Sequence, residues 1–245
     1  MKTEILYEDN NILVVYKPAG IATQTSKVGE RDVVSELKNH LKGGYVGVIH
    51  RLDQPVEGVL VFAKNQATAS VLSSQVQAKA TDGDDAGFCK DYLAVVLGVP
   101  KEAKGRLENM MIKTPERTAK IVDSSDNIAG AKKAILGYEL IETIKKDDYE
   151  LSLLRIHLET GRFHQIRAQL SHIGCPIIGD KKYGSELSIR CAEKMMIRNV
   201  SLCADRLKFT VGDGKKSKIT GKTYEYSHRP TGKLFSEFTS CNEHE

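Results

Sequence analysis

The chain has 245 residues, which suits one large domain or two small ones, and its 40% hydrophobic and 28% charged residues are ordinary for a globular protein. No apolar run reaches the length of a membrane span, and the N-terminus enters a strand pattern with early acidic residues, so we expect no membrane segment and no secretory or transit peptide. Five scattered cysteines, without a Cys-x-x-Cys pair, indicate reduced thiols in a cytoplasmic protein.

Positive charge is concentrated in one part of the chain. Residues 181–233 hold 13 Lys and Arg against 5 Asp and Glu, whereas the net charge of the whole chain is only +4. Such a local excess is what binding to a nucleic-acid backbone uses, because each neutralised phosphate releases counterions. On charge alone, a solvated basic face explains the same residues more simply.

The N-terminal quarter predicts alternating strands and turns. Strands over residues 5–7 and 12–16 flank an Asp/Asn turn, and the second strand ends in Lys17-Pro-Ala-Gly20. Residues 31–42 carry apolar side chains at helical spacing and stop at Gly43-Gly44.

Two short buried strands follow, over residues 46–49 and 58–63, and the loop between them is rich in polar side chains: His50, Arg51, Asp53 and Glu57. Polar residues on a loop held by rigid strands are typical of binding and catalytic sites. A charged turn with an internal Arg–Asp pair explains the same loop about as well.

The middle of the chain predicts a helix and then sheet. Asn65 is expected to cap a helix that ends near residue 79, with its inward face formed by Ala67, Val71, Leu72 and Val76. After it we expect an acidic loop at 81–87, a strand at 90–98, an irregular segment at 101–131 and an antiparallel pair at 134–144 and 149–158. The last strand is apolar on both faces, which indicates a central position in the sheet.

A second polar cluster follows this strand. Ile166, Leu170 and Ile173 have helical spacing, which predicts a helix that begins near 160–162 and stops at Gly174. The dipole and free N–H groups of a helix start favour an anion, and Arg162 lies beside them. A basic amphipathic helix without a site is the alternative. Farther on, residues 195–209 read as sheet and residues 212–222 as a glycine- and lysine-rich hairpin loop.

Three histidines near this helix, His157, His164 and His172, suggest a metal at first sight. Their spacings of seven and eight residues match neither a helical zinc pair nor a zinc finger, so we expect no metal.

Three separated motifs resemble those of the RluA-type pseudouridine synthases. The first is His50-Arg-Leu-Asp53 followed by Gly58, an apolar strand and Ala-Lys64, although Val56-Glu57 replaces the usual Thr-Ser. The second is the strand with Lys90 and Tyr92. The third is Thr160-Gly-Arg-Phe-His-Gln-Ile-Arg167, in which only Phe163 occupies a variable place.

The resemblance covers roughly residues 5–238 and implies an α+β pseudouridine synthase fold. In such a fold a mixed, mostly antiparallel central sheet is flanked by helices and crossed by an active-site cleft. We therefore expect one catalytic domain over residues 1–245, without an N-terminal S4-type RNA-binding domain. The implied activity is the isomerisation of specific uridines in ribosomal or transfer RNA, with no cofactor and no metal, by a monomer.

The resemblance also implies roles for individual residues. Asp53 matches the catalytic carboxylate, Tyr92 the tyrosine that stacks on the target uracil, and Arg162 the arginine that pairs with the aspartate. A carboxylate suits covalent catalysis provided that it is ionised, and an adjacent guanidinium favours that state. We expect RNA and pocket contacts from His50, Arg51, Leu52, Lys64, Lys90, Thr160, His164, Gln165 and Arg167.

Two other functions compete with this one. A catalytically silent RNA-binding protein of the same fold is supported by Glu57, whose charge would lie near Asp53 and RNA. A hydrolase that uses Asp53 and Glu57 as paired carboxylates is a weaker alternative. Because mere binding does not need a carboxylate facing phosphate, we favour the enzyme.

Overall fold

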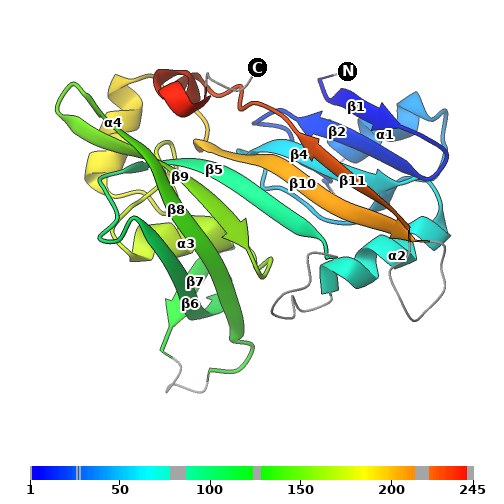
Figure 1. Cartoon of the computed structure of the whole chain (residues 1–245), viewed down its shortest axis with the longest axis horizontal. Coiled ribbons are helices and arrows are strands. Elements are labelled where there is room, and N and C mark those ends of the chain that lie inside the picture. Colours follow the sequence, from blue (N-terminus) through cyan, green and yellow to red (C-terminus); the bar gives the residue numbers. More distant parts are fainter. Residues whose placement is uncertain are drawn as a thin grey trace. The chain divides into compact units, whose positions relative to one another are not determined.

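The computed structural model describes residues 2–25, 27, 29–77, 87–123, 128–212 and 221–241 (Figure 1). The chain forms two compact units. Unit 1 contains Met1–Lys90 and Ala204–Pro230, and unit 2 contains Asp91–Cys203 and Thr231–Glu245. The expected loops at 81–87 and 212–222 fall largely outside the described residues.

Unit 1 is built on a sheet with strand order β1-β2-β4-β10, in which β3 also pairs with β4 and β11 with β10. The pairs β1–β2, β2–β4, β3–β4 and β10–β11 are antiparallel. The strands are β1 Glu4–Glu8, β2 Ile12–Lys17, β3 Gly47–Val48, β4 Glu57–Ala63, β10 Leu202–Gly212, which enters the unit at Ala204, and β11 Gly221–Ser227. Every residue of β2 and β4 is buried, including the charged residues Lys17 and Glu57 at one end of each strand. The apolar runs 12–16 and 59–63 agree with this burial. Gly58 has φ 136°, and a Cβ there would meet the Ala204 backbone oxygen at 2.4 Å, so β4 can approach β10 only with glycine at this position.

The two helices of unit 1 begin at side-chain caps. Asp32 accepts a hydrogen bond from the Ser35 amide (2.6 Å) at the start of α1, Val33–His40. The Asn65 side chain accepts one from the Thr68 amide (2.9 Å) at the start of α2, Gln66–Gln77, as predicted.

The predicted inward face of α2 was right for Leu72 and wrong for Ala67, while Val71 and Val76 are half-buried. The buried residues are Thr68, Leu72 and Gln75, whereas Ala67 is exposed. Gln75 is drawn inward because its amide exchanges hydrogen bonds with the backbone of Thr210 on β10. A polar side chain that satisfies a sheet backbone thus outweighs the apolar pattern.

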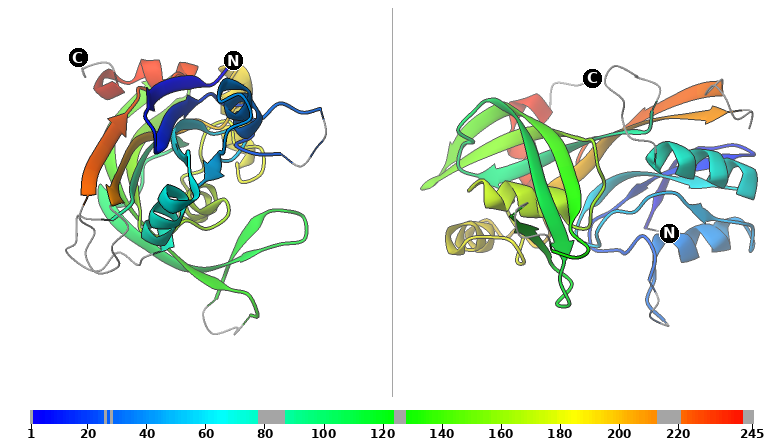
Figure 2. Two further views of the ribbon diagram at one scale, coloured as in Figure 1. Left: turned by 90° about the vertical axis from the view of Figure 1, so that its right-hand side faces the viewer. Right: turned by 90° about the horizontal axis from the view of Figure 1, so that it is seen from below.

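Unit 2 contains an antiparallel sheet of order β5-β9-β8-β6-β7 (Figures 1 and 2). The strands are β5 Cys89–Leu97, which enters the unit at Asp91, β6 Lys104–Lys113, β7 Ala119–Val122, β8 Lys132–Lys146 and β9 Tyr149–Leu158. The helices are α3 Gln165–His172 and α4 Glu186–Lys194, followed by two short 3-10 helices, Lys233–Glu237 and Thr239–Cys241. The central position of β9, between β5 and β8, confirms the prediction for that strand.

One hairpin of unit 2 and the first residues of α3 and β10 differ from the predictions. The segment expected to be irregular contains the β6–β7 hairpin, whose alternating exposed residues carry little apolar signal. Helix α3 begins at Gln165, after the left-handed residue His164, and not at 160–162. Strand β10 begins at Leu202 and not at residue 195, because α4 and a turn precede it.

The predicted α+β class with a mostly antiparallel sheet is confirmed, whereas the single catalytic domain stays a prediction. The five cysteines form no disulfide in the structure. Within the described ranges, no helix is both long and apolar enough to cross a bilayer. The same ranges contain no group of three His, Cys, Asp or Glu side chains arranged to hold a metal ion.

Candidate active site

In unit 1, Asp53 lies half-buried in the loop between β3 and β4, and both of its neighbours are anchored. The Thr23 hydroxyl donates to the Leu52 carbonyl (3.0 Å) and accepts from the Leu52 amide (3.1 Å). On the other side, the Gln54 carbonyl accepts from the Gly20 amide (2.8 Å) and from the Lys17 ammonium (3.3 Å). The backbone on both sides of the carboxylate is therefore held by fixed partners, as a preoriented catalytic group requires.

Lys17 is fully buried at the end of β2. Its ammonium also donates to the carbonyls of Pro18 (3.1 Å) and Ile21 (2.8 Å). Burial lowers the pKa of Lys17 to about 7, and the charges of Asp53 and Glu57 oppose this shift. The motif that contains Lys17 was recognised in the sequence, but neither Lys17 nor Thr23 was assigned to the site, because nothing local shows that they anchor a distant loop.

Glu57 is 3% exposed, and its Oε2 accepts a hydrogen bond from the Tyr16 hydroxyl (2.7 Å). The Tyr16 ring in turn stacks on His228, with centroids 3.8 Å apart. The expectation that Glu57 places a charge toward RNA is therefore wrong, because the carboxylate is turned into the core of unit 1. The main support for a silent RNA-binding protein, and for a pair of water-accessible carboxylates, is removed.

We predict that Lys17 makes stability depend on pH. Because its pKa in the folded chain lies below that of an unfolded lysine, the unfolded state binds more protons between about pH 7 and pH 10, so stability rises with pH there, by at most about 1.4 kcal/mol per pH unit. The free energy of unfolding of wild type and of Lys17→Met is measured with urea at pH 6.5, 8 and 9.5. The difference between the two should change in favour of wild type as pH rises.

In Glu57→Gln the same rise should begin at a lower pH, since one charge that opposes the shift is lost. Lys38→Met, on the exposed face of α1, controls for the loss of one positive charge. A constant difference between wild type and Lys17→Met across the three pH values contradicts the prediction.

The other predicted contacts of unit 1 differ in their exposure. Arg51 is exposed. His50 is half-buried, with Nδ1 closed to solvent, and its Nε2 accepts from the Val61 amide (3.3 Å). Burial, aided by the charge of Lys90, lowers the pKa of His50 to about 3. His50 is therefore uncharged at neutral pH and cannot pair with a phosphate. Lys64 forms an ion pair with Glu8 (2.7 Å). Burial lowers the pKa of Lys90.

In unit 2, Tyr92 lies on β5 opposite Ile156 of β9 and is 6% exposed. Arg162 is exposed in the loop between β9 and α3, and its Nε donates to the Lys133 carbonyl (2.8 Å). Because Asp53 belongs to unit 1 and Arg162 to unit 2, the pairing of these two residues stays a prediction.

Thr160 and Gln165 hold the loop that carries Arg162. The Thr160 hydroxyl accepts from the Ile135 amide (2.8 Å) and contacts the Gln165 side-chain oxygen (2.8 Å). The same Gln165 oxygen accepts from the Arg162 amide (2.9 Å). The side-chain NH₂ of Gln165 donates to the Ile135 carbonyl (3.0 Å). These bonds explain why α3 starts late, and they indicate that both residues shape the loop.

Arg167 does not fit the expectation of a contact with the RNA backbone. Its side chain is 5% exposed, and its Nε and Nη2 donate to Asp180 Oδ2 (2.7 Å) and Oδ1 (2.8 Å). Both donors are directed at a fully buried carboxylate, so we correct the role of Arg167 to a structural one.

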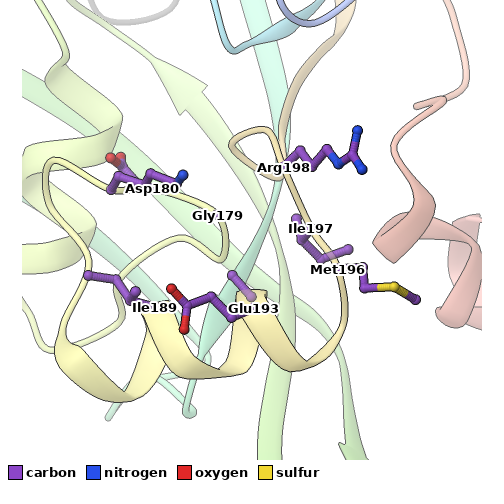
Figure 3. A pocket seen from close by; sticks show the side chains of 9 residues that line it. Gly179, Asp180, Ile189, Glu193, Met196, Ile197 and Arg198 are labelled. Atoms are coloured by element: carbon purple, nitrogen blue, oxygen red, sulfur yellow. The ribbon is translucent and has the colours of Figure 1, made fainter.

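A pocket of about 510 Å³ lies beside α4 in unit 2 (Figure 3). Figure 3 shows Ile189 and Glu193 on α4 and Met196, Ile197 and Arg198 on the segment that follows the helix. None of the residues that line the pocket was predicted individually as a catalytic or RNA-binding residue, although Lys181 and Arg198 belong to the basic segment 181–233.

The fold defines the class of protein. A solved structure of human RNA pseudouridylate synthase domain containing 1 matches with a TM-score of 0.73 at 20% identity, over 98% of this chain and 87% of that one. Human RNA pseudouridylate synthase domain containing 4 matches with a TM-score of 0.65 at 22% identity, over 84% of each chain. At such identities the likeness shows the fold alone, which is that of the pseudouridine synthases.

Sequence comparison adds the family. The family model described as RNA pseudouridylate synthase matches residues 11–172. The chain is 31% identical over 226 residues to ribosomal large subunit pseudouridine synthase C of Rickettsia bellii, covering 92% of this chain and 70% of the relative. It is 33% identical over 190 residues to ribosomal large subunit pseudouridine synthase D of Borreliella burgdorferi, covering 74% and 54%. The chain thus belongs to the RNA pseudouridylate synthase family and is an RNA pseudouridine synthase of the RluA type.

Proposed function

We propose that this enzyme isomerises a uridine of large-subunit ribosomal RNA, with Asp53 as the catalytic carboxylate. The observation that carries the proposal is the anchoring of Leu52 and Gln54, which fixes the backbone on both sides of Asp53. The names of the relatives, ribosomal large subunit pseudouridine synthases C and D, support the substrate class.

In the proposed reaction, Asp53 acts at C1′ of the target uridine while the bond between C1′ and N1 breaks. The uracil turns over, a bond forms between C1′ and C5, and the proton on C5 is lost to a base. A second proton is taken up at N1, so the reaction is an isomerisation that needs no redox partner. Tyr92 is proposed to stack on the uracil, and Arg162 to pair with Asp53 and favour its charged form.

The target uridine has to leave its stack to reach these groups. Unstacking costs a few kcal/mol, which contacts to the base and the flanking phosphates offset. Arg51 is exposed and suited to such contacts, whereas the role proposed for His50 is to support the loop without a charge. Five cysteines without a disulfide fit a reducing compartment, so we retain the proposal of a cytoplasmic enzyme.

The test is release of tritium from RNA labelled at uridine C5. We expect release from unmodified large-subunit ribosomal RNA and none from transfer RNA, with Asp53→Ala as the blank for both. Release from transfer RNA alone would overturn the substrate class and keep the activity. Release from neither, by a protein that still binds both, would contradict the proposed function.

A further inference from the structure

Phe163 is the variable residue of the third motif, and its side chain is 38% exposed at the turn before α3. A single exposed apolar side chain needs no explanation by itself. What distinguishes Phe163 is the ring stack behind it. Its ring lies on the His164 ring, with centroids 3.8 Å apart and an angle of 20° between the planes.

The His164 ring is itself held in place. Its Nδ1 bonds to the Tyr183 hydroxyl (2.8 Å), and the Tyr183 ring meets it edge-on. The Tyr183 oxygen also accepts from the Ala119 amide on β7 (2.6 Å). His164 has φ 51°, a left-handed conformation that a residue with a Cβ rarely adopts. The loop therefore accepts a disfavoured backbone conformation in which the Phe163 ring is supported by His164 and stays partly exposed.

One positive side chain lies over the Phe163 ring, and two others belong to the neighbouring residues Arg162 and Lys182. The Lys113 ammonium, at the end of β6, lies 4.8 Å from the centroid of the ring. Arg162 precedes Phe163, and Lys182 precedes Tyr183 and donates to the Arg117 carbonyl (3.2 Å). Among the described residues, no ion pair involves Lys113, Arg162 or Lys182.

We propose that Phe163 stacks on an unpaired nucleobase of the RNA substrate, and that Lys113 binds a phosphate beside it. Every base has a π-face that an aromatic ring can stack on, and cations near such a ring attract the adjacent phosphates. Lys113 has a flexible stem, so its ammonium can leave the ring for a phosphate when a base takes its place. The inference rests on the proposed function, since it needs RNA as substrate, and it concerns a second nucleotide besides the target uridine.

The test measures affinity in the catalytically inactive Asp53→Ala background, with a fluorescent fragment of the ribosomal RNA that supports tritium release. Phe163→Ala is expected to raise Kd roughly 5- to 150-fold, the loss of one base–aromatic stack, while Phe163→Tyr keeps wild-type affinity. Lys113→Met should lower the dependence of log Kd on log salt by about 0.7, the value for one single-strand phosphate. Leu187→Ala removes a 53% exposed apolar side chain of the same unit and should change nothing.

A 2-aminopurine placed in turn at each nucleotide beside the target uridine identifies the stacked base. Its fluorescence should be quenched at one position when the Asp53→Ala protein that keeps Phe163 binds, and should not be quenched there by the Phe163→Ala variant of that protein. Unchanged affinity and unchanged quenching in Phe163→Ala would overturn the stacking site and leave the proposed function intact, whereas no RNA binding by the protein with Phe163 would overturn both. Equal losses in Phe163→Ala and Leu187→Ala would also overturn it.

Discussion

Asp53→Asn is expected to lower the rate of uridine isomerisation by roughly 10⁴-fold or more, the order of loss that follows removal of a covalent catalytic group. Asparagine has nearly the shape of aspartate but no negative charge, so it can neither attack C1′ nor stabilise positive charge on the sugar. The loop should persist, because its anchors belong to Leu52 and Gln54. Single-turnover tritium release and RNA binding, measured on the same preparation, separate catalysis from folding.

Glu57→Gln is the matched control for this experiment. It neutralises the neighbouring carboxylate, which is buried against Tyr16, and is therefore expected to keep measurable turnover. Turnover by Asp53→Asn within tenfold of wild type would contradict the assignment of Asp53. Loss of turnover in Glu57→Gln alone would transfer the catalytic role to Glu57.

Asp180→Ala is expected to lower the free energy of unfolding by about 3–5 kcal/mol, a large part of the 5–15 kcal/mol typical of a domain. The change leaves the buried Arg167 guanidinium without its carboxylate. It also removes the acceptor of the backbone amides of Lys182 (2.9 Å) and Tyr183 (3.2 Å). Urea unfolding measures the loss from the shift of the midpoint.

Two controls show whether burial is the cause. Glu225→Ala breaks the ion pair with Arg206, whose two side chains are exposed (Arg206 42%, Glu225 48%). We expect this change to lower the free energy of unfolding by about 0–1 kcal/mol. The double variant Arg167→Met with Asp180→Leu replaces the buried pair by apolar side chains and should recover much of the stability lost in Asp180→Ala. A loss in Asp180→Ala no larger than in Glu225→Ala would contradict the prediction.

Elements with strong local patterns were predictable from the sequence. Strands β2, β4, β5 and β9 are apolar runs bounded by turns, and helix α1 combines periodic apolar residues with a capping side chain. The β6–β7 hairpin was missed because exposed residues alternate with partly buried ones along β6 and because its pairing with β8 is not a local property. The inward face of α2 was predicted only in part for the same kind of reason: Leu72 is buried as expected, whereas Gln75 is buried by a bond to Thr210, 135 positions away.

The candidate site shows the same division. The three motifs identified the family and the residues Asp53, Tyr92 and Arg162, whose roles stay predictions. The structure added Thr23 and Lys17 as anchors of the Asp53 loop, and it changed the expected environment of Glu57, His50 and Arg167.

By itself, the sequence determined the family, the strand pattern and the places where polar side chains gather. Only the tertiary structure decided which of these polar side chains are buried and what they bind. The physical reason is that apolar periodicity is read from neighbours along the chain, whereas the state of a charged or polar group depends on partners that folding brings to it. Glu57 and Arg167 read as exposed charges in the sequence, and they are buried because Tyr16 and Asp180 meet them there.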